Sequence, residues 1–139
     1  MNYLLDTCVV SEFAKRAPSP NVIRWLAEVD ENKLFLSVIT LGEVRRGLER
    51  LSDSPRKVQL NEWLNEELIR RFSSRLVQID SEVMLLWGGL TARLEKEGKA
   101  MPVIDSLIAA SALYHHLYLV TCNDSDFAHT DLPVINPWE

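Results

Sequence analysis

Acidic side chains recur where the sequence predicts that a buried strand ends or a helix begins. Asp6 directly follows the apolar run YLL, and Glu43 lies in the helical stretch that follows LFLS. Asp105 opens the apolar helix DSLIAASALYHH, and Asp124 and Asp126 follow the strand-like LYLVT. Carboxylates gathered in one pocket repel one another unless a divalent cation lies between them. Their hard oxygen atoms favour magnesium or manganese over softer metals.

A metal held by such carboxylates suggests one kind of reaction. One or two divalent ions can activate a water molecule and stabilise the oxygens of a phosphodiester during in-line displacement. No activated serine is evident, and His115 and His116 end a helix, where cationic side chains suit the helix dipole. The acidic pattern therefore favours metal-assisted hydrolysis of a phosphodiester.

Each acid also has a purely structural explanation. Asp6 could be a turn residue that accepts a hydrogen bond from nearby backbone. Thr40 and Glu43 form the pattern T-x-x-E, which is typical of a capping box at a helix start. Asp105 near a helix start would be favoured by the macrodipole, and the acids after LYLVT lie in a polar loop. Their common position around one predicted sheet edge is what favours a site.

The composition limits the class of protein. The chain has 139 residues, of which 47% are hydrophobic and 25% charged, and we expect a single domain over residues 1–139. No apolar run reaches the roughly 20 residues that cross a bilayer, and Asp6 and Glu12 interrupt any leader-like start, so we expect a cytoplasmic protein. The net charge of −5 argues against binding nucleic acid through bulk positive charge but is compatible with a nuclease. Cys8 and Cys122 are expected to be free thiols, and no zinc-binding cluster is present.

Short apolar runs alternate with longer amphipathic ones. Strands are predicted over residues 3–5, 34–37, 75–79 and 117–121, with a short fifth candidate over 132–135. Helices are predicted near 10–14, from Ser19-Pro20 to 29, over 41–51, from Ser54-Pro55 to about 71, over 81–97, and from Asp105 onward. This alternation predicts an α/β fold: a mainly parallel central sheet of four to five strands with helices on both faces. Ligands gather at the carboxyl ends of the strands in such sheets, which is where Asp6 lies.

Four stretches together resemble a known family. YLLDTCVVSEF, SVITLGEVRRGL, IDSLIAASAL and LVTCNDSDF, in this order and at this spacing, are similar to the motifs of the PIN-domain family. The likeness is greatest to the VapC-type and FitB-type ribonuclease toxins of bacterial toxin–antitoxin pairs, and it extends from Met1 to the closing VINPWE. Each motif alone is weak, but their order is specific. The resemblance implies a PIN-like, Rossmann-like three-layer fold.

The resemblance also implies which residues form the site. Asp6 matches the acid of an LLDT-type motif, Glu43 matches that of T-x-x-E-x-x-x-G, and Asp105 matches that of D-x-x-I-A-A. These three are implied to carry Mg²⁺ or Mn²⁺. Thr7 and Thr121 are expected to support them.

The fourth acidic position is left open by the sequence. Relatives commonly show T-R-N-x-x-D-F or T-R-D, whereas this chain has Cys122 in place of the arginine. We favour Asp126, which precedes Phe127 as in the D-F pair, with Asp124 and Asn123 as alternatives. Arg46 and Arg50, on the helix of the glutamate, are weaker candidates for contacts with phosphate or antitoxin.

The resemblance implies a magnesium-dependent endoribonuclease that acts as a toxin and hydrolyses RNA with a metal-activated water. It also implies a homodimer without membrane contact, held inactive by a cognate antitoxin whose C-terminal segment packs on the toxin. Residues 10–14 and the helical pair over 44–71 are the expected docking surfaces. The sequence does not predict the RNA target, since it contains no identifiable RNA-recognition module.

Other protein classes that place acids at strand ends fit less well. A phospho-receiver domain needs an early acidic pair and a late lysine, but Asp6 is the only acid in the first ten residues. A haloacid-dehalogenase-like phosphatase would have aspartate where Cys8 stands, and a dinucleotide-binding fold would need a glycine-rich turn. An inactive PIN-like scaffold, a DNA nuclease and an RNA-processing nuclease without an antitoxin remain as alternatives.

Overall fold

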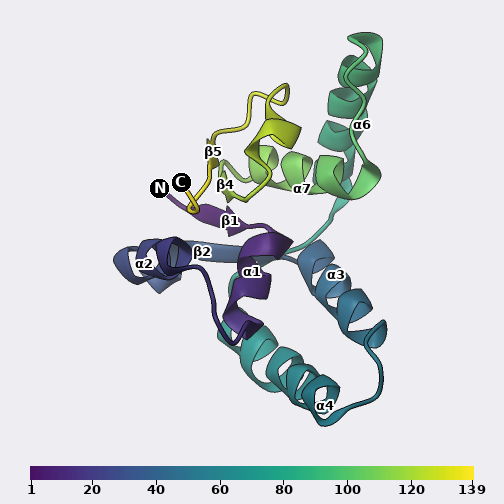
Figure 1. Cartoon of the computed structure of the whole chain (residues 1–139). Coiled ribbons are helices and arrows are strands. Elements are labelled where there is room, and N and C mark those ends of the chain that lie inside the picture. Colours follow the sequence, from purple (N-terminus) through teal and green to yellow (C-terminus); the bar gives the residue numbers. More distant parts are fainter.

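A five-stranded parallel sheet runs through the centre of the computed structural model, which describes residues 1–139 (Figure 1). The strands lie in the order β3-β2-β1-β4-β5, and every neighbouring pair is parallel. Leu4 in β1 lies opposite Phe35 in β2 and Leu119 in β4. The strands are β1 (Tyr3–Leu5), β2 (Leu34–Ser37), β3 (Leu76–Val77), β4 (Tyr118–Val120) and β5 (Val134–Ile135). The parallel sheet and its fifth strand are confirmed, although β3 is shorter than the predicted 75–79.

Helices connect the strands and make the crossovers that a parallel sheet requires. They are α1 (Thr7–Ala14), α2 (Pro20–Glu28), α3 (Val38–Glu49), α4 (Pro55–Glu62), α5 (Ile69–Arg71), α6 (Ser81–Lys96) and α7 (Val103–Tyr114). A π-helical segment, η2 (Trp63–Leu68), joins α4 to α5, and two 3₁₀ turns are η1 (Glu31–Lys33) and η3 (Asp124–Phe127). The polar helix predicted over 55–71 is therefore continuous but widened at η2.

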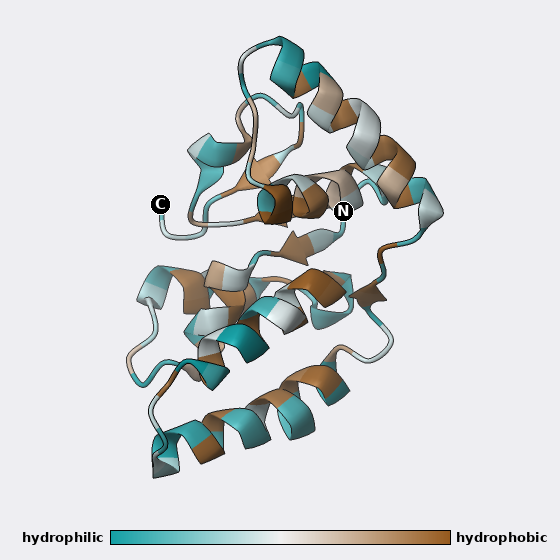
Figure 2. Cartoon of the chain, turned by 90° about the vertical axis from the view of Figure 1, so that its right-hand side faces the viewer, coloured by the Kyte–Doolittle hydropathy of each residue, from teal (hydrophilic) through white to brown (hydrophobic).

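Two hydrophobic cores lie on the two faces of the sheet. Leu4 packs with α6 and α7, whereas the next residue, Leu5, packs with α1, α2 and α3, as the alternation of side chains along a strand requires. In Figure 1, α6 and α7 lie in the upper part of the view beside β4 and β5, and α1 to α4 lie at the level of β2 and below it. The strands and α7 are the most hydrophobic stretches in Figure 2. The predicted three-layer arrangement is confirmed.

Helix starts agree with the predictions in part. Pro20 and Pro55 occupy first-turn positions, and the Ser54 side chain accepts a hydrogen bond from Lys57 N. Helix α1 begins at Thr7 rather than near residue 10, because the side chain of Asp6 caps it directly after β1. Helix α7 begins at Val103, so Asp105 lies within its first turn and does not open it. No helix is both long enough and apolar enough to cross a membrane.

Candidate active site

Asp6 is held rigidly at the carboxyl end of β1. Its side chain is only 6% exposed. Oδ1 accepts a 2.8 Å hydrogen bond from the Thr7 backbone N–H, and Oδ2 accepts one of 2.8 Å from the Thr121 hydroxyl. Burial raises the pKa of Asp6, the hydrogen bonds from Thr121 and Thr7 oppose that rise, and the charge of Asp126 adds to it. The turn role considered for Asp6 is real, yet it leaves the carboxylate buried with an elevated pKa.

Glu43 is not part of a capping box. Helix α3 begins at Val38, and its cap is Ser37, whose Oγ accepts a 3.1 Å hydrogen bond from Ile39 N. Thr40 is consequently buried inside the helix, and Glu43 lies in the second turn, where no free backbone N–H needs it. Its Oε1 instead accepts a 2.5 Å hydrogen bond from the Thr7 hydroxyl. The structural explanation of Glu43 that the sequence offered is therefore wrong.

Thr7 joins two of the acids. Its backbone N–H donates to Asp6 and its hydroxyl donates to Glu43, which belongs to a different helix. The Thr7 and Thr40 hydroxyl oxygens are 3.4 Å apart, so Thr40 also lies beside this bridge. The supporting position predicted for Thr7 thus has a physical basis in two hydrogen bonds.

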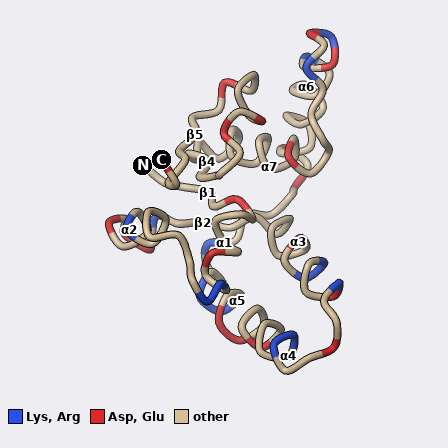
Figure 3. Tube along the Cα trace, viewed as in Figure 1, with Lys and Arg blue, Asp and Glu red and all other residues tan.

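Asp105 faces the other acids from the first turn of α7. Its pKa is raised by burial first, and then by the charges of Asp6, Asp126 and Glu43. These four carboxylates, delivered by four separate elements, therefore lie close enough to repel one another. Figure 3 shows acidic segments after β1, after β4 and at the start of α7 around one end of the sheet.

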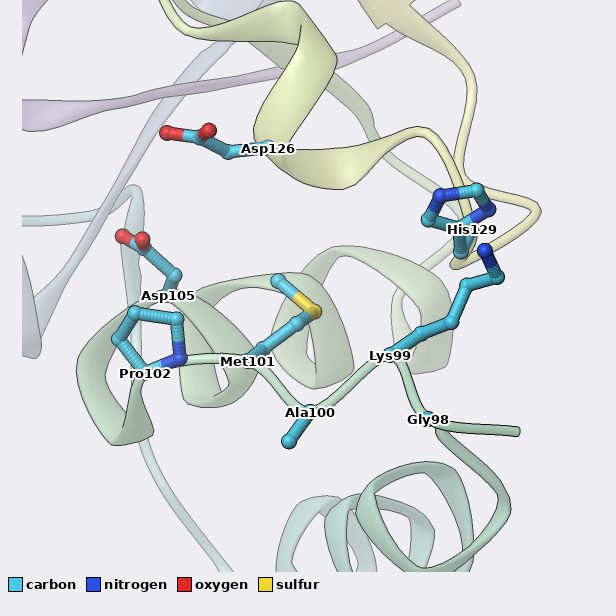
Figure 4. A pocket seen from close by; sticks show the side chains of 8 residues that line it. All are labelled: Gly98, Lys99, Ala100, Met101, Pro102, Asp105, Asp126 and His129. Carbon is cyan, nitrogen blue, oxygen red and sulfur yellow. The ribbon is translucent and has the colours of Figure 1, made fainter. Parts of the chain in front are cut away.

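The loop after β4 offers three candidates for the fourth position, and they point differently. Asp126, an exposed residue in η3, faces Asp105 across a pocket (Figure 4) and raises the pKa of both Asp6 and Asp105. Asp124 accepts a 3.2 Å hydrogen bond from Asn136 Nδ2, which ties it to the C-terminal segment. The Asn123 backbone N–H donates to Thr121, while its side chain makes no hydrogen bond. The geometry favours Asp126.

The donor set suits a divalent cation, but it does not form a closed cage. All four side chains are carboxylates, the ligands that hard cations prefer, and the pKa values of Asp6 and Asp105 are raised by burial and by nearby carboxylate charges, which a cation would neutralise. No three histidine, cysteine, aspartate or glutamate side chains lie close enough together to hold a metal ion by themselves. Magnesium typically binds one or two carboxylates and keeps water or phosphate oxygens as its other ligands. The open arrangement of the carboxylates is consistent with this mode of magnesium binding.

A cavity of about 330 Å³ opens beside Asp105 and Asp126 (Figure 4). Lys99 and His129 also line it, and neither was singled out in the sequence. The sequence around Lys99 offered one signal, Gly98, and it predicts only the end of α6. A lysine that follows a helix end is common and does not by itself indicate a functional site. Arg46 and Arg50 do not line this cavity; both are exposed on α3.

A second cavity, of about 360 Å³, lies between α1, α3 and the α4–η2 helix. Thr7 and Glu43 stand at its acidic end, and its apolar lining includes Val44, Leu48 and Trp63. We call this cavity the α1–α3 groove. It coincides with the surfaces that the sequence suggested for docking.

The two cysteines lie side by side without a disulfide bond. The Cys122 backbone N–H donates a 3.1 Å hydrogen bond to Cys8 Sγ, and burial raises the pKa of Cys8 to about 12. Cys8 is therefore a neutral thiol at pH 7, and a thiol is a poor ligand for magnesium. The expectation of free thiols is confirmed.

Comparison with known proteins agrees with this architecture. Residues 3–132 match the PIN domain family. Toxin FitB of Neisseria gonorrhoeae is 32% identical over 135 residues, which cover 97% of each chain. VapC ribonuclease Y4jK of Sinorhizobium fredii is 32% identical over 136 residues, covering 98% of this chain and 97% of that protein. The crystal structure of FitAcB from Neisseria gonorrhoeae has a TM-score of 0.93 at 31% identity, with 99% of both chains covered. A parallel sheet in the order 3-2-1-4-5, an acidic carboxyl edge and these matches together show that the chain belongs to the PIN domain family.

Proposed function

We propose that the protein is a magnesium-dependent endoribonuclease that serves as the toxin of a toxin–antitoxin pair. The observation that carries this proposal is the convergence of four acids: Asp105 and Asp126 line one cavity, and Thr7 hydrogen-bonds to both Asp6 and Glu43, whose charges act on Asp105. A relative of almost equal length is named a VapC ribonuclease, and another is named a toxin. Manganese could replace magnesium, since both are hard cations with oxygen ligands.

One or two of the four carboxylates would hold the ion directly, the others would lie around it, and water or substrate oxygens would complete its coordination. A bound divalent ion supplies an activated water and stabilises the oxygens of the phosphodiester. The protein contributes position: Thr121 and Thr7 fix both oxygens of Asp6, so this carboxylate needs no reordering when RNA arrives. Thr7 likewise fixes the half-buried Glu43 side chain through the hydrogen bond to its Oε1. Asp105 and Asp126 border the open cavity, where substrate can enter.

Calorimetry with manganese, in parallel with RNA cleavage, tests the site. Wild type should bind manganese and cleave RNA, and Asp6→Asn and Asp105→Asn should lose both while remaining folded. In the loop after β4, Asp126→Asn should weaken both activities, whereas the matched variant Asp124→Asn should leave them unchanged. Folded Asp6→Asn or Asp105→Asn protein that cleaves at the wild-type rate would overturn the proposal. An inactive scaffold would bind no manganese even with RNA present.

The α1–α3 groove is the proposed site for a segment of the cognate antitoxin. Val44, Leu48 and Trp63 offer an apolar floor, and Glu43, Lys15 and Arg56 also line the groove, so the incoming segment would present apolar side chains with charges of both signs. A segment seated there would also reach the acidic site, which accounts for inhibition. Leu48 is almost fully buried, so we prefer Trp63→Ala as the test: it should weaken neutralisation by the antitoxin while RNA cleavage persists. If the antitoxin neutralised Trp63→Ala as well as wild type, its segment would bind outside the α1–α3 groove.

A homodimer is also proposed, on the basis of exposed apolar side chains on the α6–α7 pair. Leu85 on α6 is 78% exposed and Val103 on α7 is 61% exposed; the proposal is that they form one apolar patch with Met84 and Ile104, since a contiguous exposed patch marks an interface whereas scattered side chains do not. Sedimentation of wild type and Val103→Asp tests this. A monomeric wild type would refute it.

A further inference from the structure

We propose that Lys99 and His129 form a subsite for a backbone phosphate of RNA, next to the phosphate that is cleaved. This inference rests on the proposed ribonuclease function and extends it to substrate binding. Both residues line the 330 Å³ cavity that Asp105 and Asp126 also line. Figure 4 shows the two carboxylates facing each other at one end of the cavity and the Lys99 ammonium pointing toward the His129 ring at the other.

Lys99 is placed there by the way α6 ends. Gly98 adopts the left-handed conformation, with φ of 71°, which glycine tolerates best. The Lys99 N–H donates to Leu94 O at 2.8 Å, and the Gly98 N–H donates to Glu95 O at 3.1 Å. This is the Schellman pattern of a helix C-terminus, and it fixes the direction in which the chain leaves α6. The backbone that carries the lysine is thus ordered, although its side chain is exposed.

His129 is held by contacts of its neighbours. Thr130 is buried, and its hydroxyl donates a 2.7 Å hydrogen bond to Phe127 O and accepts one from Leu132 N. Phe127 itself is buried in the core. Arg93 on α6 donates a 3.3 Å hydrogen bond to His129 O, so α6 supports both halves of the subsite.

Neither side chain has a partner in the protein. Lys99 takes part in no ion pair: the two nearby basic–acidic pairs that involve α6 are those of Arg93 with Glu97 and with Asp131. The His129 ring makes no hydrogen bond, because its recorded contact is through the backbone oxygen. Two donors without partners, aimed into a cavity, can bind an anion without first breaking an existing bond. An ammonium group commonly binds phosphate as a point charge.

The charges within the cavity fit a chain of phosphates better than a single one. The acidic end repels RNA unless a divalent ion neutralises it, so it suits the phosphodiester that is cleaved. The basic end lies within the same cavity and attracts a neighbouring phosphate without any metal. Contacts to backbone phosphate position nucleic acid without reading its bases, so the subsite would act on every RNA sequence alike.

Steady-state cleavage of a fluorophore-labelled single-stranded RNA at saturating magnesium tests the subsite. Lys99→Ala should raise KM about tenfold with kcat nearly unchanged, because a distant phosphate contact stabilises substrate and transition state equally. The dependence of log KM on log salt should become shallower by about 0.7. Lys99→Arg should restore both values. Lys96→Ala is the matched control, because Lys96 lies one turn earlier, is exposed, and does not line the cavity.

A second readout does not require catalysis. Titration of metal-free protein with inorganic phosphate should shift the His129 ring resonances in wild type but not in Lys99→Ala, while those of His115 and His116 stay in place. A wild type that cleaves no RNA would overturn the ribonuclease proposal, and the phosphate titration would still decide the subsite. A His129 ring that ignores phosphate, or an unchanged KM in Lys99→Ala, would overturn the subsite itself.

Discussion

The hydroxyl of Thr121 donates a 2.8 Å hydrogen bond to Oδ2 of Asp6 across a sequence separation of 115 residues. Thr121 directly follows β4, and Asp6 directly follows β1, which pairs with β4. Both residues are buried. The bond therefore connects the ends of two adjacent strands and holds an acid at the point where the metal site is proposed.

Replacement of Thr121 by valine should destabilise the protein by about 1–3 kcal/mol, because a buried oxygen of Asp6 loses its donor. The pKa of Asp6 should rise further, since the Thr121 bond lowers it. Thr121→Ser keeps the hydroxyl and should lie much closer to wild type. Urea unfolding of the three proteins measures the difference. Equal stability of the valine and serine variants would show that the hydroxyl contributes nothing.

Loss of the Thr7 hydroxyl should impair cleavage more than stability. Thr7→Val frees Glu43 from its 2.5 Å hydrogen bond, and a displaced acid can reduce the rate about ten- to a hundredfold. Thr7→Ser retains a donor and should keep most of the activity. The backbone hydrogen bond from residue 7 to Asp6 persists in both variants. A difference in kcat between them therefore reports the hydroxyl bond to Glu43 and not the backbone bond to Asp6. An unchanged kcat in Thr7→Val would show that Thr7 does not position Glu43 for cleavage.

The metal-free protein should lose stability as pH rises above the ordinary carboxyl range. Burial and the charges of Asp6, Asp126 and Glu43 raise the pKa of Asp105 above its usual 3.8. Between pH 3.8 and the raised pKa of folded Asp105, the unfolded chain has released the proton of residue 105 while the folded chain still holds it, so deprotonation favours unfolding. Below pH 3.8 both states are protonated, and the penalty vanishes.

Asp105→Asn isolates this effect. The free energy of unfolding of the variant minus that of wild type should be near its minimum at about pH 3 and larger at about pH 7, in the presence of a chelator. Manganese should then stabilise wild type and not the variant. If the difference in free energy of unfolding between Asp105→Asn and wild type is independent of pH, the charges of the other acids do not act on Asp105.

One buried hydroxyl links α6 to α7 in addition to their apolar packing. Trp87 Nε1 donates a 2.9 Å hydrogen bond to Ser106 Oγ, and Ser106 follows Asp105 directly. Ser106→Ala leaves the indole N–H without a partner and should cost about 1–3 kcal/mol, visible in thermal unfolding. Trp87→Phe in the same background removes that donor, so the double variant should lose less than the sum of the two single losses. Additive losses would argue against the bond.

The elements were predictable because their signals are local. The runs YLL, LFLS and LYLV alternate with helices, which indicates a parallel sheet, and the two Ser-Pro pairs mark helix starts that the structure contains. The start of α3 was misjudged, because a serine at the end of a strand caps the helix three residues before the T-x-x-E pattern. Local pattern cannot decide between two capping residues so close together.

The sequence indicated the candidate acids, whose role stays a prediction, but it did not indicate their surroundings. Strand ends place Asp6 by topology alone, whereas the cavity beside Asp105 depends on how two loops approach each other. Lys99 and His129 are 30 positions apart and belong to no shared motif, so only the folded arrangement brings them to one cavity. The choice among Asn123, Asp124 and Asp126 likewise depends on the bond from Asn136 to Asp124, which no local pattern reveals.

The strand order has a consequence for the time at which a newly made chain can acquire the proposed activity. Strand β1 is synthesised first but lies in the middle of the sheet, and its neighbour β4 comes more than a hundred residues later. During translation β1 can pair with β2 alone, and the acidic pocket lacks Thr121 and Asp126 until the last part of the chain has left the ribosome. A prematurely terminated chain should therefore lack the proposed ribonuclease activity, and under the proposed toxin function full-length release would mark the moment at which an antitoxin is first needed.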